Sequence, residues 1–530
     1  MSTVHSSGVL APEGANTPVG VLAERKRYRA PWWLVVLALA TVTVVSIPLL
    51  YLVVRVWGLP LENVANIFQR PRVGELAWNT ISLSVAVTAT TLVLGTAIAA
   101  LITRIRVGIP RTWLLLSALP LAVPSYLASY GWLVISPGLS GFLPSYLLLT
   151  AVTVPYVILP VAAALRGTSA DAESVARTLG QGPIRAFTTV TWPQVRPAAI
   201  AGALLVFLYT VSDFGLVAML RFQTLTWGIQ QAYAASFDRS QAAVLALLLV
   251  VIALVVVAAE RRVRGQVARS VGTHMPLESV STPFRILTVG LIASPIVIGV
   301  VAPLVGMGIR LFQAETLQAI DYPRLFLATA NTVGVSVVAA VFALALALPL
   351  AALAARYSSR FVGALESLGY LSHALPGIVV GLSLVFLSLA VVPSLYQTVA
   401  VLVFAYAVLF MPKALGTARS SIEGVSPGLV DVARTLGASP FQAWRRVTLP
   451  LALPGLGIGA LLVAITTMKE LPATLLLRPT GFDTLATELW SKTTAAEFGV
   501  AAPYAALLVL IAAIPAMILS GVRGTAKEEI

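Results

Sequence analysis

Three ionisable residues stand inside stretches that are otherwise apolar: Asp213, Lys469 and Glu470. An ionisable side chain inside a bilayer costs roughly 2.5 to 3.5 kcal/mol on insertion scales, so such a residue marks a candidate functional site. Each acid is followed by a residue that disturbs a helix, Gly215 or Pro472. Carboxylates, and the backbone carbonyls freed at such an interruption, are hard oxygen ligands that can contact a hard cation or build a gate.

The acidic pair admits two interpretations. Asp213 and Glu470 could contact a cation directly, or they could form a lock or an outer gate without metal, in which Lys469 or Glu470 pairs with Asp213. Each acid lies 16 residues beyond a proline, Pro197 or Pro454. That separation corresponds to roughly 24 Å of helix, toward the outer end of a hydrocarbon layer about 30 Å thick. Lys469 is the one basic residue that the sequence places inside a span, which favours a cation over an anion as substrate.

The elements that position these residues are apolar runs. Hydrophobic residues make up 58% of the 530 and charged residues 11%. The runs are continuous rather than alternating, which predicts membrane-spanning helices and not barrel strands. The twelve predicted spans are 31–54, 77–103, 112–135, 143–165, 197–220, 241–259, 286–309, 325–355, 364–391, 393–412, 453–477 and 499–522. The expected fold class is an all-α polytopic membrane protein.

The chain contains two copies of one unit. At a spacing of 252 residues Pro124 corresponds to Pro376, and at a spacing of 257 the hexapeptide VARTLG at 175–180 recurs at 432–437. The second spacing also relates Asp213 to Glu470. Both copies begin on the same side of the membrane. The repeat is therefore parallel, with six helices in each half and a pseudo-twofold axis along the membrane normal.

The distribution of Lys and Arg predicts the orientation. With the N-terminus inside, the cytoplasmic segments hold 25 of the 35 basic residues and the outer segments hold nine. We expect a cytoplasmic tail over 1–30, a first transmembrane domain over 31–260, a cytoplasmic linker over 261–284 and a second transmembrane domain over 285–530. Both termini would be cytoplasmic. These loops account for the net charge of +14, so no nucleic-acid partner is expected, and the absence of cysteine excludes disulfides and thiolate metal sites.

Each half has one long inner loop that is built like a folded element, at 166–196 and 413–453. Each loop predicts a short helix ended by Gly180 or Gly437, a turn, and a second short helix that begins at a proline. Such an element could lie on the membrane interface with its arginines at the headgroups, or it could dock into a groove of a cytoplasmic partner. Retention of nearly the same loop in both halves favours a partner that is itself two-fold.

These loops resemble the EAA loop of ABC importer permeases. The resemblance implies coupling to ATP-binding subunits, and it rests on Glu173, Ser174, Ala176, Arg177 and Gly180 in the first half and on Asp431, Ala433, Arg434 and Gly437 in the second. The first loop departs from the family pattern. Ser174 stands where the family has an acid, and Glu173 is displaced by one residue, about 100° around a helix.

The resemblance becomes more specific around the intramembrane acids. The stretches MKELPATLLLRPTGFDTLATELW at 468–490 and SDFGLVAMLRFQTLTWGIQQAY at 212–233 are similar to the fused two-domain permeases of ferric iron importers. This similarity implies inward movement of ferric iron from an extracytoplasmic solute-binding protein. Tyr126 and Tyr130 could then join Asp213, Glu470 and Lys469 along the pathway, with Asp213 and Glu470 as candidate metal ligands. Each tyrosine could equally be an ordinary packing or interface residue.

No phosphate-binding G-x-x-x-x-G-K-[ST] motif occurs in the chain. We therefore expect no enzyme activity and no cofactor bound by this chain, with ATP and Mg on separate partners. By the resemblance, the partners are two ATP-binding subunits forming a homodimer, and the location is the bacterial cytoplasmic (inner) membrane, with multiple passes through the lipid bilayer.

Other functions stay open at this point. The same machine could carry thiamine, a phosphonate or a polyamine. A secondary transporter driven by an ion gradient also uses parallel six-helix repeats, but it gives no reason for the repeated loop. The sequence offers no paired carboxylates and no histidine cluster that would support a membrane-embedded enzyme, since the chain has three histidines.

Overall fold

The computed structural model of the protein describes residues 30–168, 170–235, 238–264 and 278–525. Over these residues the chain is helical, and its single β-bridge, between Ile105 and Glu278, belongs to no sheet. The predicted all-α class is confirmed. Nearly all of the expected tail over 1–30 and the middle of the expected linker, 265–277, lie outside the described residues.

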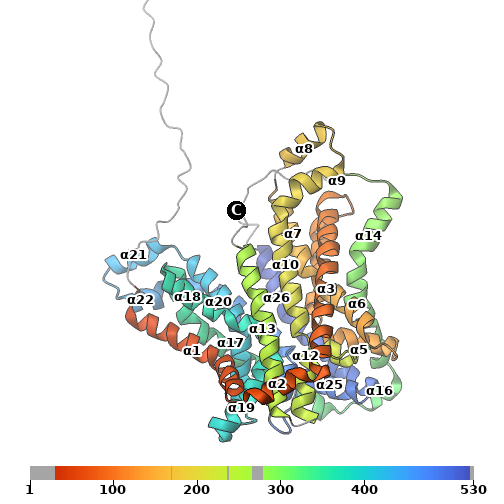
Figure 1. Cartoon of the computed structure of the whole chain (residues 1–530). Coiled ribbons are helices and arrows are strands. Elements are labelled where there is room, and N and C mark those ends of the chain that lie inside the picture. Colours follow the sequence, from red (N-terminus) through yellow and green to blue (C-terminus); the bar gives the residue numbers. More distant parts are fainter. Residues whose placement is uncertain (1–29, 169, 236–237, 265–277, 526–530) are drawn as a thin grey trace, which may run out of the picture.

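Helices follow one another along both halves (Figure 1). The first half contains α1 (Trp32–Trp57), α2 (Leu61–Gln69), α3 (Pro71–Arg104), α4 (Pro110–Ala118), α5 (Ser125–Ile135), α6 (Phe142–Thr153), α7 (Pro155–Arg166), α8 (Ala170–Thr178), α9 (Pro183–Ala186), α10 (Trp192–Ser212), α11 (Gly215–Met219), α12 (Leu225–Gln230) and α13 (Arg239–Arg264). The second half contains α14 (Thr282–Ile296), α15 (Ala302–Leu311), α16 (Ala314–Gln318), α17 (Tyr322–Arg356), α18 (Arg360–Gly369), α19 (Gly377–Val391), α20 (Val399–Glu423), α21 (Pro427–Thr435), α22 (Pro440–Ala443), α23 (Leu449–Met468), α24 (Pro472–Leu477), α25 (Leu485–Thr494) and α26 (Phe498–Thr525).

Short 3-10 or π turns join several of these helices. They are η1 (Leu119–Ala122), η2 (Phe187–Thr191), η3 (Gln231–Ala235), η4 (Val297–Val301), η5 (Leu371–Ala374), η6 (Pro393–Leu395) and η7 (Trp444–Thr448). The π turns η2, η4 and η7 each lie within one continuous helical run, over Pro183–Ser212, Thr282–Leu311 and Pro440–Met468.

Among the described residues, nine helices are long and apolar enough to cross a membrane. A tenth would be the bent pair Pro110–Ala122 and Ser125–Ile135, whose arms meet at 87°. Two shorter apolar helices, Gly377–Val391 and Phe498–Ala513, accompany them. The chain is therefore a polytopic helical membrane protein, and the total of twelve spans stays a prediction.

Two predicted spans are broken at a proline that the repeat relates. Val123 and Leu375 have ψ of 122° and 118°, outside the helical region, and Pro124 and Pro376 both have φ −60° and ψ 143°. Proline disfavours helical backbone in the residue before it and offers no N–H to the preceding turn. The chain therefore turns at these points, and α5 and α19 begin as new helices inside the bundle.

The same hydrogen bond recurs in both halves, as a duplicated unit requires. The hydroxyl of Thr80 on α3 accepts from the backbone N–H of Leu225 at 2.8 Å, and that of Thr332 on α17 accepts from Leu485 at 2.9 Å. These bonds tie the segment after each intramembrane break to the longest helix of its own half. The duplication read from the sequence therefore extends to individual contacts.

The first helix of each half packs on the other half. Helix α1 lies against α17, α18 and α19, and the hydroxyl of Thr41 donates to the Leu346 carbonyl at 2.9 Å. Helix α14 with η4 and α15 lies against α4, α5 and α6, and the indole N–H of Trp132 donates to the Ile298 carbonyl at 2.9 Å. This exchange of first helices joins the two halves into one buried core.

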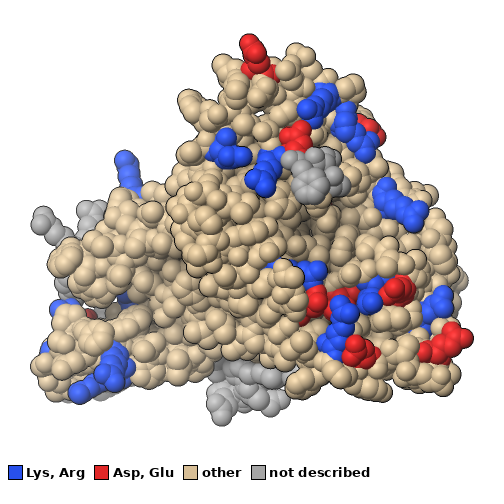
Figure 2. All heavy atoms as spheres, turned by 90° about the horizontal axis from the view of Figure 1, so that it is seen from below, with Lys and Arg blue, Asp and Glu red and all other residues tan. Residues whose placement is uncertain are grey.

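The two halves meet at one end of the molecule and diverge at the other. In Figure 1, helices α5, α16 and α25 gather at the lower end, whereas α8 with α9 and α21 with α22 stand at separate tips. Seen from below, charged side chains form several separate groups, some of them with both signs, and wide areas carry neither sign (Figure 2). An uncharged surface of this kind suits contact with lipid.

One boundary differs from the sequence-based expectation in a way that matters for the site. The predicted loop 413–453 begins inside α20, which continues to Glu423. Arg419 bonds the carboxylates of Glu366 and, at 3.0 Å, Glu423, so charged groups support the last turns of the helix. Lys413 consequently lies within the helix and not at its end.

Candidate functional sites

The two inner loops fold alike. We call residues 170–191 the first loop element and residues 427–448 the second loop element. In each, a glycine ends the first short helix: Gly180 has φ +87° and Gly437 has φ +90°. A side chain with Cβ rarely adopts this left-handed backbone, so glycine is required there. The predicted helix ends are confirmed.

The same bonding pattern closes both helix ends. In the first loop element Gln181 N–H bonds Ala176 O at 3.1 Å and Gly180 N–H bonds Arg177 O at 3.0 Å, a Schellman motif. In the second, the equivalent bonds of Ala438 and Gly437 both measure 3.0 Å. The second short helix then begins at a proline, in α9 and in α22, as the sequence predicted.

Each loop element exposes three apolar side chains at positions that the repeat relates. Their exposed fractions are 56% for Val175, 78% for Leu179 and 80% for Ile184, and 57% for Val432, 83% for Leu436 and 65% for Phe441. The sequence-based site did not include them. The spacing of 257 residues that relates the hexapeptides also relates these six residues, and it could have found them. Matched exposed apolar groups on a polar tip are typical of a docking surface.

A buried carboxylate links the first loop element to the transmembrane helices of its own half. Glu173 is 1% exposed and accepts from both terminal nitrogens of Arg104 on α3, at 2.8 and 2.6 Å. It also accepts a short hydrogen bond from the Thr191 hydroxyl. Burial raises the pKa of Glu173, but the bonds from Arg104 and Thr191 and the nearby arginine charges outweigh it, so the net pKa is lowered.

The other predicted residues of this element differ in their exposure to solvent. Ala176 is 6% exposed and packs inward, whereas Ser174 is exposed. Arg177 bonds Glu278 at 2.5 Å, so it joins the first loop element to the segment that enters the second half. The displaced acid therefore points into the protein, and Ser174 occupies the outward position.

The second loop element has no equivalent buried carboxylate to link it to its half. Val430 stands at the position of Glu173, and Arg356, the counterpart of Arg104, donates to the Val425 carbonyl at 3.1 Å instead. Asp431 and Arg434 are exposed, Ala433 is half-buried, and α21 has no fully buried residue. The two elements thus share a backbone but not an anchor.

Inside the membrane-spanning part, each predicted interruption is present and each acid caps the helix after it. Asp213 Oδ1 accepts from the N–H groups of Leu216 at 3.0 Å and Val217 at 3.4 Å. Its Oδ2 accepts from the Ser125 hydroxyl at 2.5 Å. Asp213 therefore joins the start of α5 to the start of α11.

Glu470 repeats this arrangement in the second half. Its Oε1 accepts from Ala473 N–H at 2.9 Å, and its Oε2 accepts from the N–H of Thr474 at 3.0 Å and from the hydroxyl of that residue at 2.7 Å. The Thr474 hydroxyl also lies 2.6 Å from that of Tyr406. Both carboxylates are occupied by helix-capping bonds.

Glu470 also lies beside the start of the broken helix α19. A Cβ on Gly377, the first residue of α19, would come within 2.6 Å of its Oε1. The 15 residues of α19 extend from that point for roughly 22 Å, toward the end opposite the loop elements (Figure 1). The depth of Glu470 relative to the membrane surfaces stays a prediction.

Lys469 pairs with neither acid in the part of the chain that the structure describes. Its ammonium group donates to the Ala122 carbonyl at 2.9 Å, across the junction of the halves. The hydroxyl of Tyr126 donates in the opposite direction, to the Lys469 carbonyl at 3.3 Å. Tyr130 is fully buried and donates to the Phe498 carbonyl at 2.7 Å. Lys469 and both tyrosines therefore lie where the halves meet.

Sequence reasoning missed one basic residue here. Lys413 lies inside the α20 span and donates to the Thr466 hydroxyl at 3.1 Å. The expectation that Lys469 is the one basic residue inside a span is therefore wrong. The predicted span ended at 412, one residue too early to include Lys413.

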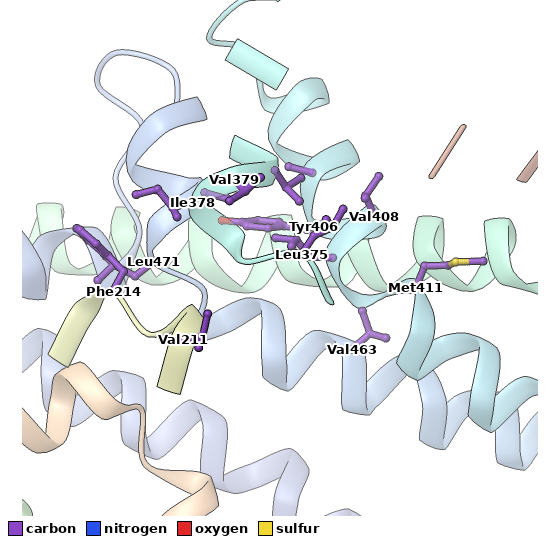
Figure 3. Packing of buried hydrophobic residues seen from close by; sticks show 14 of the residues in the cluster. Val211, Phe214, Leu375, Ile378, Val379, Tyr406, Val408, Met411, Val463 and Leu471 are labelled. Atoms are coloured by element: carbon purple, nitrogen blue, oxygen red, sulfur yellow. The ribbon is translucent and has the colours of Figure 1, made fainter. Parts of the chain in front are cut away.

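Apolar side chains close the space between the two breaks. Phe214 and Leu471, the residues after the two acids, are each 1% exposed and belong to one buried cluster. They lie together in Figure 3, and the Phe214 ring centroid is 5.1 Å from that of Trp490 in the other half. No group of three or more His, Cys, Asp or Glu within the described residues is arranged to hold a metal ion.

Comparison with known proteins provides independent evidence about the family of this chain. The family model of the binding-protein-dependent transport system inner membrane component matches residues 16–267 and 347–521. The chain is 33% identical, over 93% of its own length and 98% of the relative, to the Fe(3+)-transport system permease protein FbpB 2 of Haemophilus influenzae.

Shorter matches are to permeases named for other substrates. The chain is 30% identical to the 2-aminoethylphosphonate transport system permease protein PhnV of Salmonella typhimurium, over 30% of this chain and 59% of the relative. It is also 30% identical to the molybdenum transport system permease protein ModB of Mycobacterium tuberculosis, over 34% of this chain and 72% of the relative.

Proposed function

The chain belongs to the family of binding-protein-dependent transport system inner membrane components, and we propose that it is the permease of an ATP-driven importer that moves ferric iron inward. It is a multi-pass inner-membrane protein and a component of transport, not itself an enzyme. The observation that carries the iron assignment is the match to an Fe(3+)-transport permease over nearly the full length of both chains.

In this proposal the two loop elements seat in two ATP-binding subunits that form a homodimer. Their matched exposed residues Val175, Leu179 and Ile184 supply apolar contact, and Val432, Leu436 and Phe441 do the same in the second half. Arg177 and Arg434 flank these surfaces. ATP and Mg stay on the partners, and both chain termini are cytoplasmic, on the same side as the loop elements.

At the opposite end, an extracytoplasmic solute-binding protein delivers the substrate. The buried Phe214 and Leu471 then act as a closed gate, and the halves diverge on the cytoplasmic side (Figure 1). Asp213 and Glu470 hold the backbone of the gate by capping α11 and α24. A direct contact between these acids and the metal would require one of the capping bonds to open.

A phosphonate is the second candidate substrate, since two lysines, Lys413 and Lys469, lie within or at the end of spans in the second half. Uptake of radioactive iron and growth on 2-aminoethylphosphonate as phosphorus source, each in a strain that lacks this chain, separate the two. Full iron uptake without the chain would refute the iron assignment. Transport in vesicles without nucleotide would instead support a carrier driven by an ion gradient.

A further inference from the structure

Two lysines share one face of the second half inside the membrane-spanning part. Lys413 on α20 donates to the hydroxyl of Thr466 at 3.1 Å, and Thr466 precedes Lys469 by three residues, about one turn of α23. Both ammonium groups therefore lie along the same side of α23. Because Lys469 reaches the Ala122 carbonyl of the first half at 2.9 Å, this side faces the junction between the halves.

The position of Lys413 is set by the close crossing of α20 and α23. A Cβ on Gly455 would meet the Ser421 hydroxyl at 2.0 Å, and one on Gly459 would meet the Thr417 hydroxyl at 2.2 Å. Only residues without a side chain allow this approach. Lys413 lies one turn beyond Thr417 along the same seam, ten residues or roughly 15 Å before α20 ends, so it is not a terminal residue reaching for headgroups.

Neither lysine has an acidic partner among the described residues. The neighbouring carboxylate, Glu470, is directed away and caps α24 with both oxygens. The remaining contact of Lys413 is the ring of Phe410, whose centroid lies 5.3 Å from its Nζ. Charged side chains inside a membrane are normally paired with an opposite charge or take part in function. Here two positive charges on one face find no counterion within the described parts of the chain.

The first half carries different side chains at the positions that the repeat relates. Val161 and Ser212 replace Lys413 and Lys469, and Tyr209 replaces Thr466. The ring of Tyr209 lies 5.9 Å from that of Tyr156, and both tyrosines are half-buried. The surface of the first half that the repeat relates to the lysine face therefore carries phenol groups and no lysine.

We propose that Lys413 and Lys469 bind an oxyanion, a phosphate or a carboxylate group, that crosses the membrane together with the metal. The species transported is then a ferric–oxyanion complex and not a bare cation. The lysines neutralise the anion, and the hard phenol oxygens of the first half face the metal. This inference rests on the proposed iron function and adds the chemical form of the substrate.

The test uses the complete transporter, purified with the subunits that accompany this chain and placed in lipid nanodiscs. Binding of radioactive phosphate and of radioactive citrate is measured with and without ferric ion. We expect at least one anion to bind, with affinity at least tenfold weaker in K413Q and K469Q and lost in the double variant. The charge-retaining K413R/K469R variant should keep binding, and K492Q, whose lysine pairs with Glu497 at the outer surface, is the matched control.

The outcomes distinguish this inference from the function on which it rests. If wild-type cells take up radioactive iron but the double glutamine variant takes it up equally well, the inference is overturned and the iron function stands. If wild-type transporter binds neither anion, the inference is also overturned. If lysine-dependent anion binding occurs but cells lacking the chain import iron normally, the iron function fails and the site is that of an oxyanion transporter. Thermal unfolding of each variant shows whether a loss of binding reflects misfolding.

Discussion

The two loop elements are alike in backbone and different in how they are held. Both end their first helix with a Schellman motif at a left-handed glycine, and both expose apolar residues at the same three related positions. Only the first has a buried acid, Glu173, bonded to an arginine at the end of the long helix of its own half. In the second, Val430 stands in that place and Arg356 bonds a backbone carbonyl.

The loop elements therefore meet two separate requirements, which the similarity of their sequences does not reveal. In the proposed assembly the shape that fits a two-fold partner must be the same on both sides, and the repeat preserves this shape. The connection from that shape to the transmembrane helices can differ. In the first half the connection is an ion pair within the chain. Under the proposed function, the second loop element would therefore depend more on its ATP-binding partner for order.

The largest expected effect comes from removing the anchor. Glu173→Ala leaves Arg104 half-buried without its carboxylate, and breaking a buried pair in this way costs about 3 kcal/mol. We expect a lower unfolding temperature and faster proteolysis of the first loop element. Thermal unfolding in detergent and limited proteolysis measure both.

The matched control for this variant is Val430→Ala at the equivalent position of the second half. It removes a half-buried side chain from α21 without touching a charge, so its effect should be well under that of Glu173→Ala. Equal destabilisation by the two variants would contradict the asymmetry.

A second comparison concerns the two intramembrane caps. In the first half Ser125 and the shorter Asp213 fill the space where α5 meets α11, and in the second half Gly377 and the longer Glu470 fill the equivalent space. The combined size of each pair is preserved. Glycine is required at 377 because any Cβ would press on the glutamate oxygen at 2.6 Å.

Exchanging one member of a pair should therefore be worse than exchanging both. Gly377→Ser alone overpacks the junction and should cost roughly 2 kcal/mol. The double variant Gly377→Ser with Glu470→Asp reproduces the first half and should recover most of this loss. Thermal unfolding of the wild type, of Gly377→Ser, of Glu470→Asp and of the double variant gives the coupling energy, and additive effects would show that the two positions are independent.

Much of this organisation could be predicted from the sequence, because it depends on local and periodic signals. Continuous apolar runs predicted the helices, the recurring hexapeptide predicted the duplication, and Gly180 and Gly437 predicted the helix ends. The breaks after Asp213 and Glu470 were also expected from the residues that follow them.

What the sequence could not supply were contacts between distant segments. Nothing near Glu173 indicates that Arg104, 69 residues earlier, would bind it. The approach of Glu470 to the start of α19 likewise joins segments far apart in the sequence. Lys413 was missed because apolar character declines at that point while the helix continues through α20.

The third prediction concerns the part that the two loop elements share. Ala in place of Gly180 or Gly437 must adopt left-handed backbone, at a cost of roughly 1 kcal/mol. No atom lies within 4 Å of an added Cβ at either site, so the cost should be the same in both. The rate of amide hydrogen exchange in the preceding helix measures it. Asn, which tolerates this backbone, should have a smaller effect at both positions.

The smallest effect is a pH dependence confined to the first loop element. The arginine and threonine bonds lower the pKa of Glu173 below its ordinary value of 4.5. A group with a lowered folded pKa contributes stability above its unfolded pKa and loses it as the pH falls through the folded pKa. Between pH 7 and 5 we therefore expect no change from this group. Below 4.5, amide exchange in α8 should accelerate relative to α21, after correction for intrinsic rates.

The variant that isolates this cause is Glu173→Gln, which keeps a hydrogen-bond acceptor near Arg104 but does not titrate. In it, the exchange rates of α8 and α21 should change in parallel on acidification. If wild-type α8 instead followed α21 through the whole range below pH 4.5, the buried carboxylate would not be the anchor, and the asymmetry between the loop elements would have to arise from packing alone.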